Sequence, residues 1–198
     1  MNSDLTKILS FTDMIHKFRA VERVILVQGQ DRDENDSEHS YTLAMLSWYI
    51  NSTYKAGLDI DKLIKYALVH DLVEVHAGDT YFYQKDPKVL QDKHEREEKA
   101  AKQLNEEHPE FPELHEMIAA YEKREDQESK FIYALDKVEP MFSIYLDNGR
   151  TWNKLKITLE MLIGMKKDKV ALDPTIEKIF NDMVSHLNDN HDELFDTK

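Results

Sequence analysis

Residues 60–79 read IDKLIKYALVHDLVEVHAGD, and this stretch decides how the rest of the chain is interpreted. Its apolar residues recur every three or four positions, which is the pattern of a helix buried along one face. The buried positions are Ile60, Leu63, Ile64, Ala67, Leu68, Leu72 and Val75. The pattern predicts a helix that begins near Asp59 or Asp61 and stops at Gly78.

Three polar side chains lie near the end of this predicted helix. Glu74 follows His70 by four residues and Asp71 by three, so the three side chains converge on one patch. Placing an imidazole and two carboxylates at an apolar helix end is costly unless they pair or bind a metal. Imidazole nitrogen and carboxylate oxygen suit a divalent transition metal. The segment therefore indicates a metal site, and a hydrogen-bonded cluster that only fixes the helix is the alternative.

Two other polar residues fall on predicted buried helix faces. His39 extends an apolar stripe by one turn in a helix whose predicted N-cap is Ser37. Asp136 follows two apolar residues by one turn in a helix predicted over Glu128–Leu146. A capped core histidine and a salt-bridged aspartate are the respective alternatives. A second His-Asp dipeptide, His191-Asp192, lies in polar sequence without periodicity, so the sequence context carries the information and the dipeptide alone does not.

The whole sequence predicts an all-α fold, a bundle of about seven to eight helices in one domain spanning residues 1–198. A length of 198 residues fits one domain. Only 5 Gly and 5 Pro leave few turns, which favours long helices. Residues 5–165 form the predicted core of the domain, and residues 166–198 supply C-terminal helices and a polar tail. A polar, Asp- and Asn-rich stretch over 29–36 predicts a loop.

The composition narrows the class of partner. The chain has 26 Lys and Arg against 39 Asp and Glu, a net charge of −13, which argues against a DNA or RNA duplex or an anionic membrane as partner. A small anionic substrate stays compatible, because a metal or an Arg can reverse the potential inside a cleft. The chain has no Cys, no apolar run of the roughly 20 residues that a membrane span needs, and no signal-peptide pattern. A cytoplasmic protein is expected.

The order and context of four residues resemble the H…HD…D pattern of the HD-domain metal-dependent phosphohydrolases. His39 precedes His70-Asp71 by 31 residues, and Asp136 follows Asp71 by 65. Residues 32–40 (RDENDSEHS) and 70–79 (HDLVEVHAGD) resemble the R-x-E-x-x-S-E-H-S and H-D-x-x-E-x-x-x-G-D motifs of the bacterial 5′-deoxynucleotidase branch. Residues 135–139 (LDKVE) are similar to the third motif of that branch, and the resemblance covers roughly residues 5–165.

This resemblance implies a helical HD-domain bundle with one divalent metal ion, which is Mn, Co, Fe, Ni, Zn or Mg. The implied ligands are His39, His70, Asp71 and Asp136. In that branch the carboxylates that match Glu74 and Asp79 handle protons and position water. The metal acidifies a bound water and neutralises the phosphate, while a carboxylate orients the attack.

The resemblance also points to substrate-binding residues. With a one-residue insertion, Arg23 matches the Arg that contacts the phosphate and sugar end of the substrate. Arg32 would supply further positive charge for a nucleotide. The bacterial enzyme carries a Trp after its Arg, which helps to exclude a 2′-hydroxyl, whereas this chain has Val24 there. The resemblance therefore does not carry over the selectivity for 2′-deoxynucleotides.

The sequence and the resemblance together predict a metal-dependent phosphomonoesterase, a 5′-nucleotidase acting on ribo- or deoxynucleoside 5′-monophosphates. One alternative is an HD-type hydrolase of a phosphodiester, a nucleoside triphosphate or an alarmone. The other is a non-catalytic module that binds metal or nucleotide, and the presence of Glu74 and Asp79 argues against it. Relatives are often dimers, so a homodimer is a predicted partner, and the aromatic loop Tyr81-Phe82-Tyr83 is available to cover the site or that partner.

Overall fold

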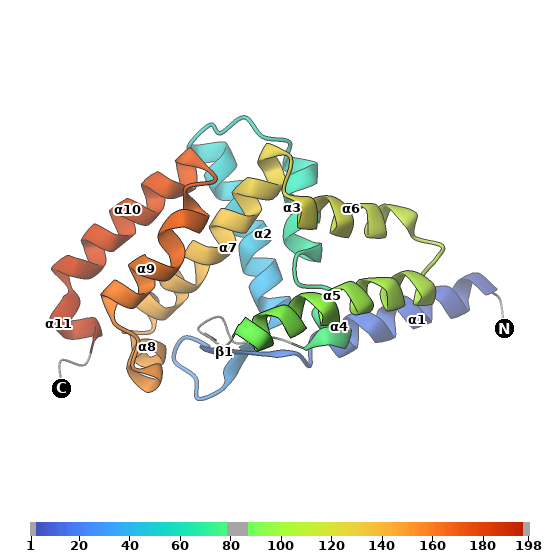
Figure 1. The fold of residues 1–198 in the computed structure, drawn as a ribbon, viewed down its shortest axis with the longest axis horizontal. Helices are drawn as coiled ribbons and strands as arrows, with labels where there is room; N and C mark the ends of the chain where they lie inside the picture. The colour runs from blue at the N-terminus through green and yellow to red at the C-terminus, as the bar shows by residue number, and fades with distance from the viewer. Residues whose placement is uncertain (1–2, 79–86, 196–198) are drawn as a thin grey trace.

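The computed structural model describes residues 3–78 and 87–195 and is built almost entirely of helices (Figure 1). Within these residues, eight helices have ten or more residues: α1 (Ser3–Phe18), α2 (Asp36–Thr53), α3 (Ile60–Val69), α5 (Pro87–Glu107), α6 (Pro112–Lys123), α7 (Gln127–Leu146), α9 (Leu159–Val170) and α10 (Pro174–Asp189). Three shorter ones are α4 (Glu74–Ala77), α8 (Arg150–Leu155) and α11 (His191–Leu194). The all-α prediction is confirmed. No described helix is long and apolar enough to cross a bilayer.

Helix α7 lies at the centre, in contact with α2, α3, α9 and α10 (Figure 1). It is surrounded because apolar side chains occur on several of its faces, and Phe131, Ile132, Leu135 and Val138 are all fully buried. Burying each such side chain stabilises the fold by about 1.5–3 kcal/mol. A polar residue on one of these buried faces therefore lies in the interior of the protein, as Asp136 does.

A second, smaller apolar cluster fixes the turn that follows α3. Leu72 and Val73 from this turn are buried together with Met14 and Phe18 of α1 and Leu104 of α5, and residues of α6 complete the cluster. The two apolar side chains hold the turn from one side. The neighbouring His70 and Asp71 consequently have a fixed backbone from which to reach the centre of the fold.

The helix predicted to run as far as Gly78 is interrupted, and this part of the prediction is wrong. Helix α3 ends at Val69, residues 70–73 form turns, and α4 begins at Glu74. The apolar period continues through Leu72, but its side chain is buried against the second cluster instead of the face of α3. Tertiary packing has thus replaced a continuous helix by a turn.

The cap of helix α2 lies two residues before the predicted one. Its N-cap is Asn35 and not Ser37, because Asn35 Oδ1 accepts from the Glu38 amide at 3.0 Å and Glu38 Oε2 accepts from the Asn35 amide at 3.1 Å. This reciprocal pair is a capping box. It fixes the first turn of α2, from which His39 projects.

Two short strands occur where no sheet was predicted. Strand β1 (Glu22–Leu26) pairs antiparallel with β2 (Asp33–Asn35), with Glu22 opposite Asn35 and Leu26 opposite Asp33. The loop predicted over residues 29–36 therefore contains β2. Strand β1 also contacts α7 and α8, so it places Arg23 and the residues after it beside the central helix.

Candidate active site

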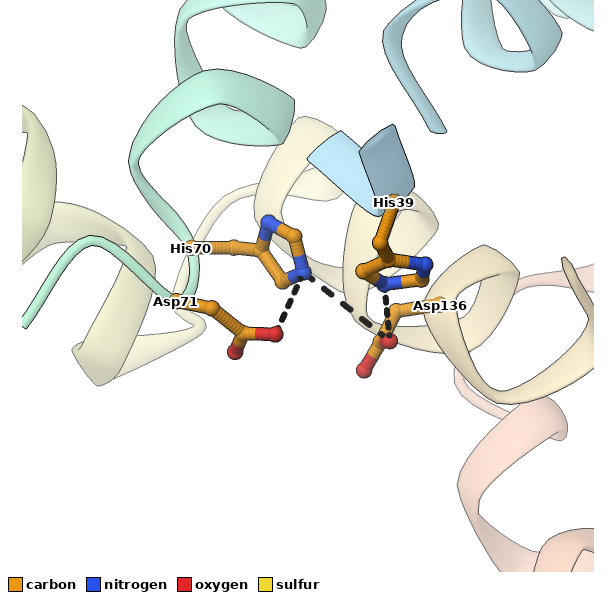
Figure 2. A group of neighbouring side chains, drawn as sticks. All are labelled: His39, His70, Asp71 and Asp136. Carbon is orange, nitrogen blue, oxygen red and sulfur yellow. Dashed lines mark hydrogen bonds and ion pairs between the residues drawn. The ribbon is translucent and has the colours of Figure 1, made fainter. Parts of the chain in front are cut away.

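Four side chains from three parts of the chain meet beside α7 (Figure 2). His39 projects from α2, His70 and Asp71 follow α3 directly, and Asp136 lies on α7. One nitrogen or carboxylate oxygen of each lies within 4.8 Å of the others. His39 Nε2 lies 3.1 Å from Asp136 Oδ1, and His70 Nε2 lies 3.0 Å from Asp71 Oδ2. The structure thus brings together the four residues predicted as metal ligands.

The orientation of His70 fits a metal ion. Its Nδ1 lies 2.9 Å from the carbonyl of Ala67 and must donate there, because a carbonyl can only accept. In the neutral ring Nε2 then carries the lone pair, and it is buried 3.0 Å from Asp71 Oδ2 and 3.9 Å from Asp136 Oδ1. A lone pair that faces carboxylate oxygens is repelled by them, so this arrangement needs either a proton on Nε2 or a cation between the groups. A divalent cation among two imidazoles and two carboxylates meets that requirement.

His39 is held from behind by a residue that the sequence analysis did not single out. Its Nδ1 lies 2.9 Å from Glu139 Oε2, and Glu139 Oε1 accepts from the Ser143 hydroxyl at 2.6 Å. Burial and Arg23 lower the pKa of His39, but hydrogen bonds to Asp136 and Glu139 outweigh them and raise it to about 10. A metal held at Nε2 would therefore have to displace a proton. Glu139 would continue to orient the ring, as carboxylates commonly do behind a ligating histidine.

Removing this support should weaken metal binding without removing a ligand. Glu139→Ala is expected to lower the affinity for a divalent metal by about 10–100-fold, the usual cost of losing a group that orients a ligand. Competition with a chelating dye measures the change. Ser143→Ala is the matched control, because Ser143 contacts Glu139 but not His39, and its effect should be smaller. Unchanged affinity in Glu139→Ala would show that His39 needs no support from this carboxylate.

Arg23 connects this cluster to a group of buried acids. Its Nη1 lies 2.8 Å from Asp71 Oδ2 and 3.2 Å from Asp36 Oδ1, and its Nε lies 3.8 Å from Glu34 Oε2. Burial raises the pKa of Asp71, but His70 and Arg23 outweigh burial and hold it well below its usual range. The pKa of Glu34 is shifted in the opposite direction, because burial and the nearby Glu139 carboxylate raise it to about 7. Arg23 therefore keeps Asp71 ionised and ready to act as a ligand.

Glu74 lies next to the cluster at the start of α4. It is buried, and one of its carboxylate oxygens lies within 4.8 Å of oxygens from Asp71 and Asp36. Lys93 Nζ on α5 is 3.7 Å from Glu74 Oε1 and 3.2 Å from Glu97 Oε1. Glu74 is outside the group of four ligands, although it lines the same cavity as Asp71 and Asp136.

The structure does not bring every predicted site residue to this place. Arg32 is exposed, forms a two-pronged ion pair with Glu38 at 2.6 and 2.8 Å, and is not among the described residues that line the cavity. Its role in substrate binding stays a prediction. Asp79 and the aromatic loop Tyr81-Phe82-Tyr83 lie outside the described residues.

The cavity beside the cluster contains about 830 Å³ of empty space, its open mouth included. One part is ionic, with carboxylates and cations side by side: Asp71, Glu74, Asp136, Arg23, Lys93, Lys137 and Lys166. The other part is apolar apart from Thr151: Val24, Ile25, Pro140, Met141, Ile144, Trp152, Leu155, Ile157 and Leu162. A ligand with an anionic end and an apolar end matches this division.

Two lysines of the cavity, Lys93 and Lys166, were not foreseen from the sequence, whereas a salt bridge of Asp136 was the alternative stated for that residue. Lys137 pairs with Asp136, and Lys166 on α9 donates from Nζ to the carbonyl of Lys137 at 2.6 Å. Lys166 is buried, and this burial lowers its pKa to about 7. In the sequence Lys166 belongs to a charged stretch that resembles an exposed helix face. Only the packing of α9 on α7 turns it inward.

Comparison with known families agrees with the geometry. A family model described as HD domain matches residues 15–179. The chain belongs to the HD domain family. The family resemblance inferred from His39, His70-Asp71 and Asp136 is therefore confirmed, and all four residues lie within the matched HD domain segment.

Several relatives of this HD domain carry names that describe an activity. The chain is 33% identical over 135 residues to the 5′-deoxynucleotidase HDDC2 of Homo sapiens, a match that covers 67% of this chain and 64% of that protein. It therefore spans just under two thirds of the human relative's length. The 5′-deoxynucleotidase YGK1 of Saccharomyces cerevisiae is 28% identical over 171 residues, or 82% of this chain and 77% of that protein.

A solved structure supports the fold over nearly the whole length. The crystal structure described as a predicted metal-dependent phosphohydrolase from Magnetospirillum magnetotacticum MS-1 superposes with a TM-score of 0.80 at 26% identity. The match covers 94% of each chain. The helices that place the four clustered residues therefore belong to a fold shared along both chains.

Proposed function

We propose that this HD domain, spanning residues 1–198, is a metal-dependent phosphomonoesterase that releases phosphate from nucleoside 5′-monophosphates. The observation that carries the proposal is a cluster of two imidazoles and two carboxylates at ligand spacing, whose carboxylates Asp71 and Asp136 line one cavity together with the buried Glu74 and several cations. The ionic end suits a phosphate dianion, and the apolar end suits a nucleoside. The names of the human and yeast relatives support a nucleotide as substrate.

In this proposal His39, His70, Asp71 and Asp136 hold one divalent ion, which supplies Lewis-acid stabilisation of the phosphate and acidifies water. Glu74 lies beside the ligands without belonging to them, so it orients the attacking water and accepts its proton. Attack at phosphorus breaks the bond to the 5′-oxygen. That oxygen leaves with a proton, for which Asp79 is the proposed donor. Lys93 and Lys137 stabilise the negative charge of the phosphate.

A panel of phosphate compounds tests this function. The purified protein is incubated with divalent metals and with nucleoside 5′-monophosphates, triphosphates, cyclic and linear phosphodiesters and alarmones, and released phosphate or nucleotide is measured. We expect the highest kcat/KM on nucleoside 5′-monophosphates. Preference for a diester or a triphosphate would replace the proposed reaction by another HD-type hydrolysis. Nucleotide binding without turnover of any compound would indicate a binding module.

The sugar preference depends on a residue that lines the cavity next to Arg23. Val24 stands where the bacterial 5′-deoxynucleotidase branch has a Trp, so it leaves more room beside the sugar. We expect the wild-type protein to hydrolyse ribonucleotides and deoxynucleotides at comparable rates. Val24→Trp should lower kcat/KM for the ribonucleotide relative to its deoxy counterpart by about 10-fold or more, in the range of steric discrimination in a pocket. An unchanged ratio would mean that position 24 does not contact the 2′-carbon.

We also propose that the protein forms a homodimer through an apolar face. An apolar hollow lies between α1, α2, α3 and α6, and Ile15, Tyr41 and Leu68 line it and are exposed. The same helices α1 and α2 carry further exposed apolar side chains, namely Ile8, Leu9, Met45 and Trp48. Exposed apolar surface of this kind usually marks an interaction site, and two-fold dimers are the commonest assembly. Tyr41→Glu should convert a dimer to a monomer in sedimentation equilibrium. A monomeric wild-type protein at micromolar concentration would contradict this proposal.

A further inference from the structure

The cavity follows one face of α7 away from the metal-ligand cluster. Its lining includes Asp136, then Pro140 and Met141, then Ile144, which recur at the four-residue spacing of a single helix face. Eight residues of helix span about 12 Å. The lining changes along this distance from ionic to apolar. A phosphate placed at Asp136 therefore leaves the rest of its ester directed toward Ile144 and α8.

Trp152 on α8 lines the apolar end, where it and Thr151 carry polar groups, and the hydroxyl of Thr151 already accepts from the Leu26 amide. Its side chain is 1% exposed and stacks on Phe195, with ring centroids 4.9 Å apart and an interplanar angle of 15°. The indole N–H is buried and has no hydrogen-bond partner among residues 3–78 and 87–195. A buried donor without an acceptor is costly and rare. An acceptor brought by a molecule in the cavity would remove this cost.

The surroundings hold Trp152 in place. Strand β1 and α7 both contact α8, and Thr151 accepts a hydrogen bond from the Leu26 amide at 3.0 Å. One ring face of Trp152 is covered by Phe195, so the indole has little freedom to turn toward another acceptor. An anchored aromatic ring with one donor can select a ligand by its shape and by the position of its acceptor atom.

We propose that the apolar end of the cavity is the nucleobase subsite and that Trp152 is its specificity-determining residue, donating its indole N–H to an acceptor of the base. This inference rests on the proposed nucleotide substrate. Because indole donates but cannot accept, the bound edge of the base must present a carbonyl oxygen or an unprotonated ring nitrogen. Purines and pyrimidines both carry such atoms, whereas a sugar phosphate without a base does not fill this end.

Direct binding can be followed without altering Trp152. The chain has two Trp residues, and the other, Trp48, is 53% exposed on α2. In Trp48→Phe the fluorescence therefore reports on Trp152 alone. We expect deoxyadenosine or thymidine to change its emission in a saturable way, and 2-deoxyribose to leave it unchanged. Emission that responds to neither nucleoside would overturn the subsite.

Kinetics then separate base recognition from a structural role. Trp152→Phe should lower kcat/KM about 10-fold or more on the preferred nucleoside 5′-monophosphate, as when a substrate loses a hydrogen bond in a pocket. Its kcat/KM on 2-deoxyribose 5-phosphate should stay within about threefold of wild type. An equal loss on both substrates, or no loss on either, would overturn the inference. If the wild-type protein hydrolyses no nucleotide, the proposed function fails, and the nucleoside titration still decides the subsite.

Discussion

Replacing Asp71 by alanine is expected to remove the bound metal and the hydrolytic activity together. Asp71 Oδ2 lies 3.0 Å from His70 Nε2 and 2.8 Å from Arg23 Nη1. Its loss therefore removes one of the proposed ligands and one of the carboxylates that pair with the Arg23 guanidinium. Metal stabilisation of a phosphoryl group is worth several kcal/mol, and about 4 kcal/mol corresponds to a factor of 10³ in rate. We therefore expect kcat/KM to fall at least about 10³-fold. Metal content by mass spectrometry and phosphate release measure the two effects.

The chain provides its own control for this experiment. Asp192 belongs to the second His-Asp pair, where its carboxylate lies 3.5 Å from His191 Nδ1, and its side chain is 95% exposed on α11. Asp192→Ala should change neither metal content nor turnover. Loss of metal in Asp192→Ala, or full metal content in Asp71→Ala, would mean that the ligands have been assigned to the wrong dipeptide.

Glu74→Gln is expected to keep the metal and the affinity for nucleotide while kcat falls. The amide keeps the size of the side chain but cannot accept a proton from water. A positioned general base typically contributes about 10²–10⁴-fold, so a loss of this size is expected in kcat with little change in KM. Steady-state kinetics on the preferred nucleotide, with metal content measured in the same samples, provide the test.

Glu97→Gln is the matched control for Glu74. Both carboxylates approach Lys93, at 3.7 Å from Glu74 and 3.2 Å from Glu97, but only Glu74 lines the cavity among the described residues. Like Glu74→Gln, the control removes one negative charge from the surroundings of Lys93, and it should leave kcat near the wild-type value. Near-normal turnover in Glu74→Gln with metal bound would show that this carboxylate is structural.

The cluster of His39, His70, Asp71 and Asp136 could be predicted because its signal is local. Each of His39, His70 and Asp136 is a polar residue on the apolar face of a helical pattern, and such placement is costly unless the groups are paired. The prediction that these helix faces are buried was enough to place the three residues in the core, and it required no knowledge of the tertiary arrangement. The exposed His191-Asp192 pair lacks that context and lies far from the cluster in the chain.

The features that were missed depend on packing between distant segments. The turn after Val69 could not be predicted from a pattern whose apolar period continues, because Leu72 is buried against α1 and α5 and not along α3. His108 lies among charged neighbours in sequence, which predicts a solvated side chain, yet it is 1% exposed and packs edge-on against Phe11. Glu139 did have a usable signal, since it follows Asp136 by three residues and shares its helix face.

Strand β1 shows a different reason for a missed element. Its sequence ERVIL contains β-branched residues, which favour strands, but it is only five residues long and follows an amphipathic helix. Its partner β2 has the sequence DEN, which has low strand propensity. The pair is stabilised by what it contacts, namely α7 and α8, and those contacts are the reason that Arg23 and Val24 reach the cavity.

The most direct test of the central claim is a crystal structure of the manganese-loaded protein, with an anomalous-difference map calculated at the metal's absorption edge. The account predicts one peak between α2, α3 and α7, with nitrogen atoms of His39 and His70 and oxygen atoms of Asp71 and Asp136 at about 2.0–2.3 Å. Glu74 should lie near the peak but outside ligand distance. A peak elsewhere, or four side chains that stay in hydrogen-bond contact with one another without a peak in manganese-saturated crystals, would contradict it.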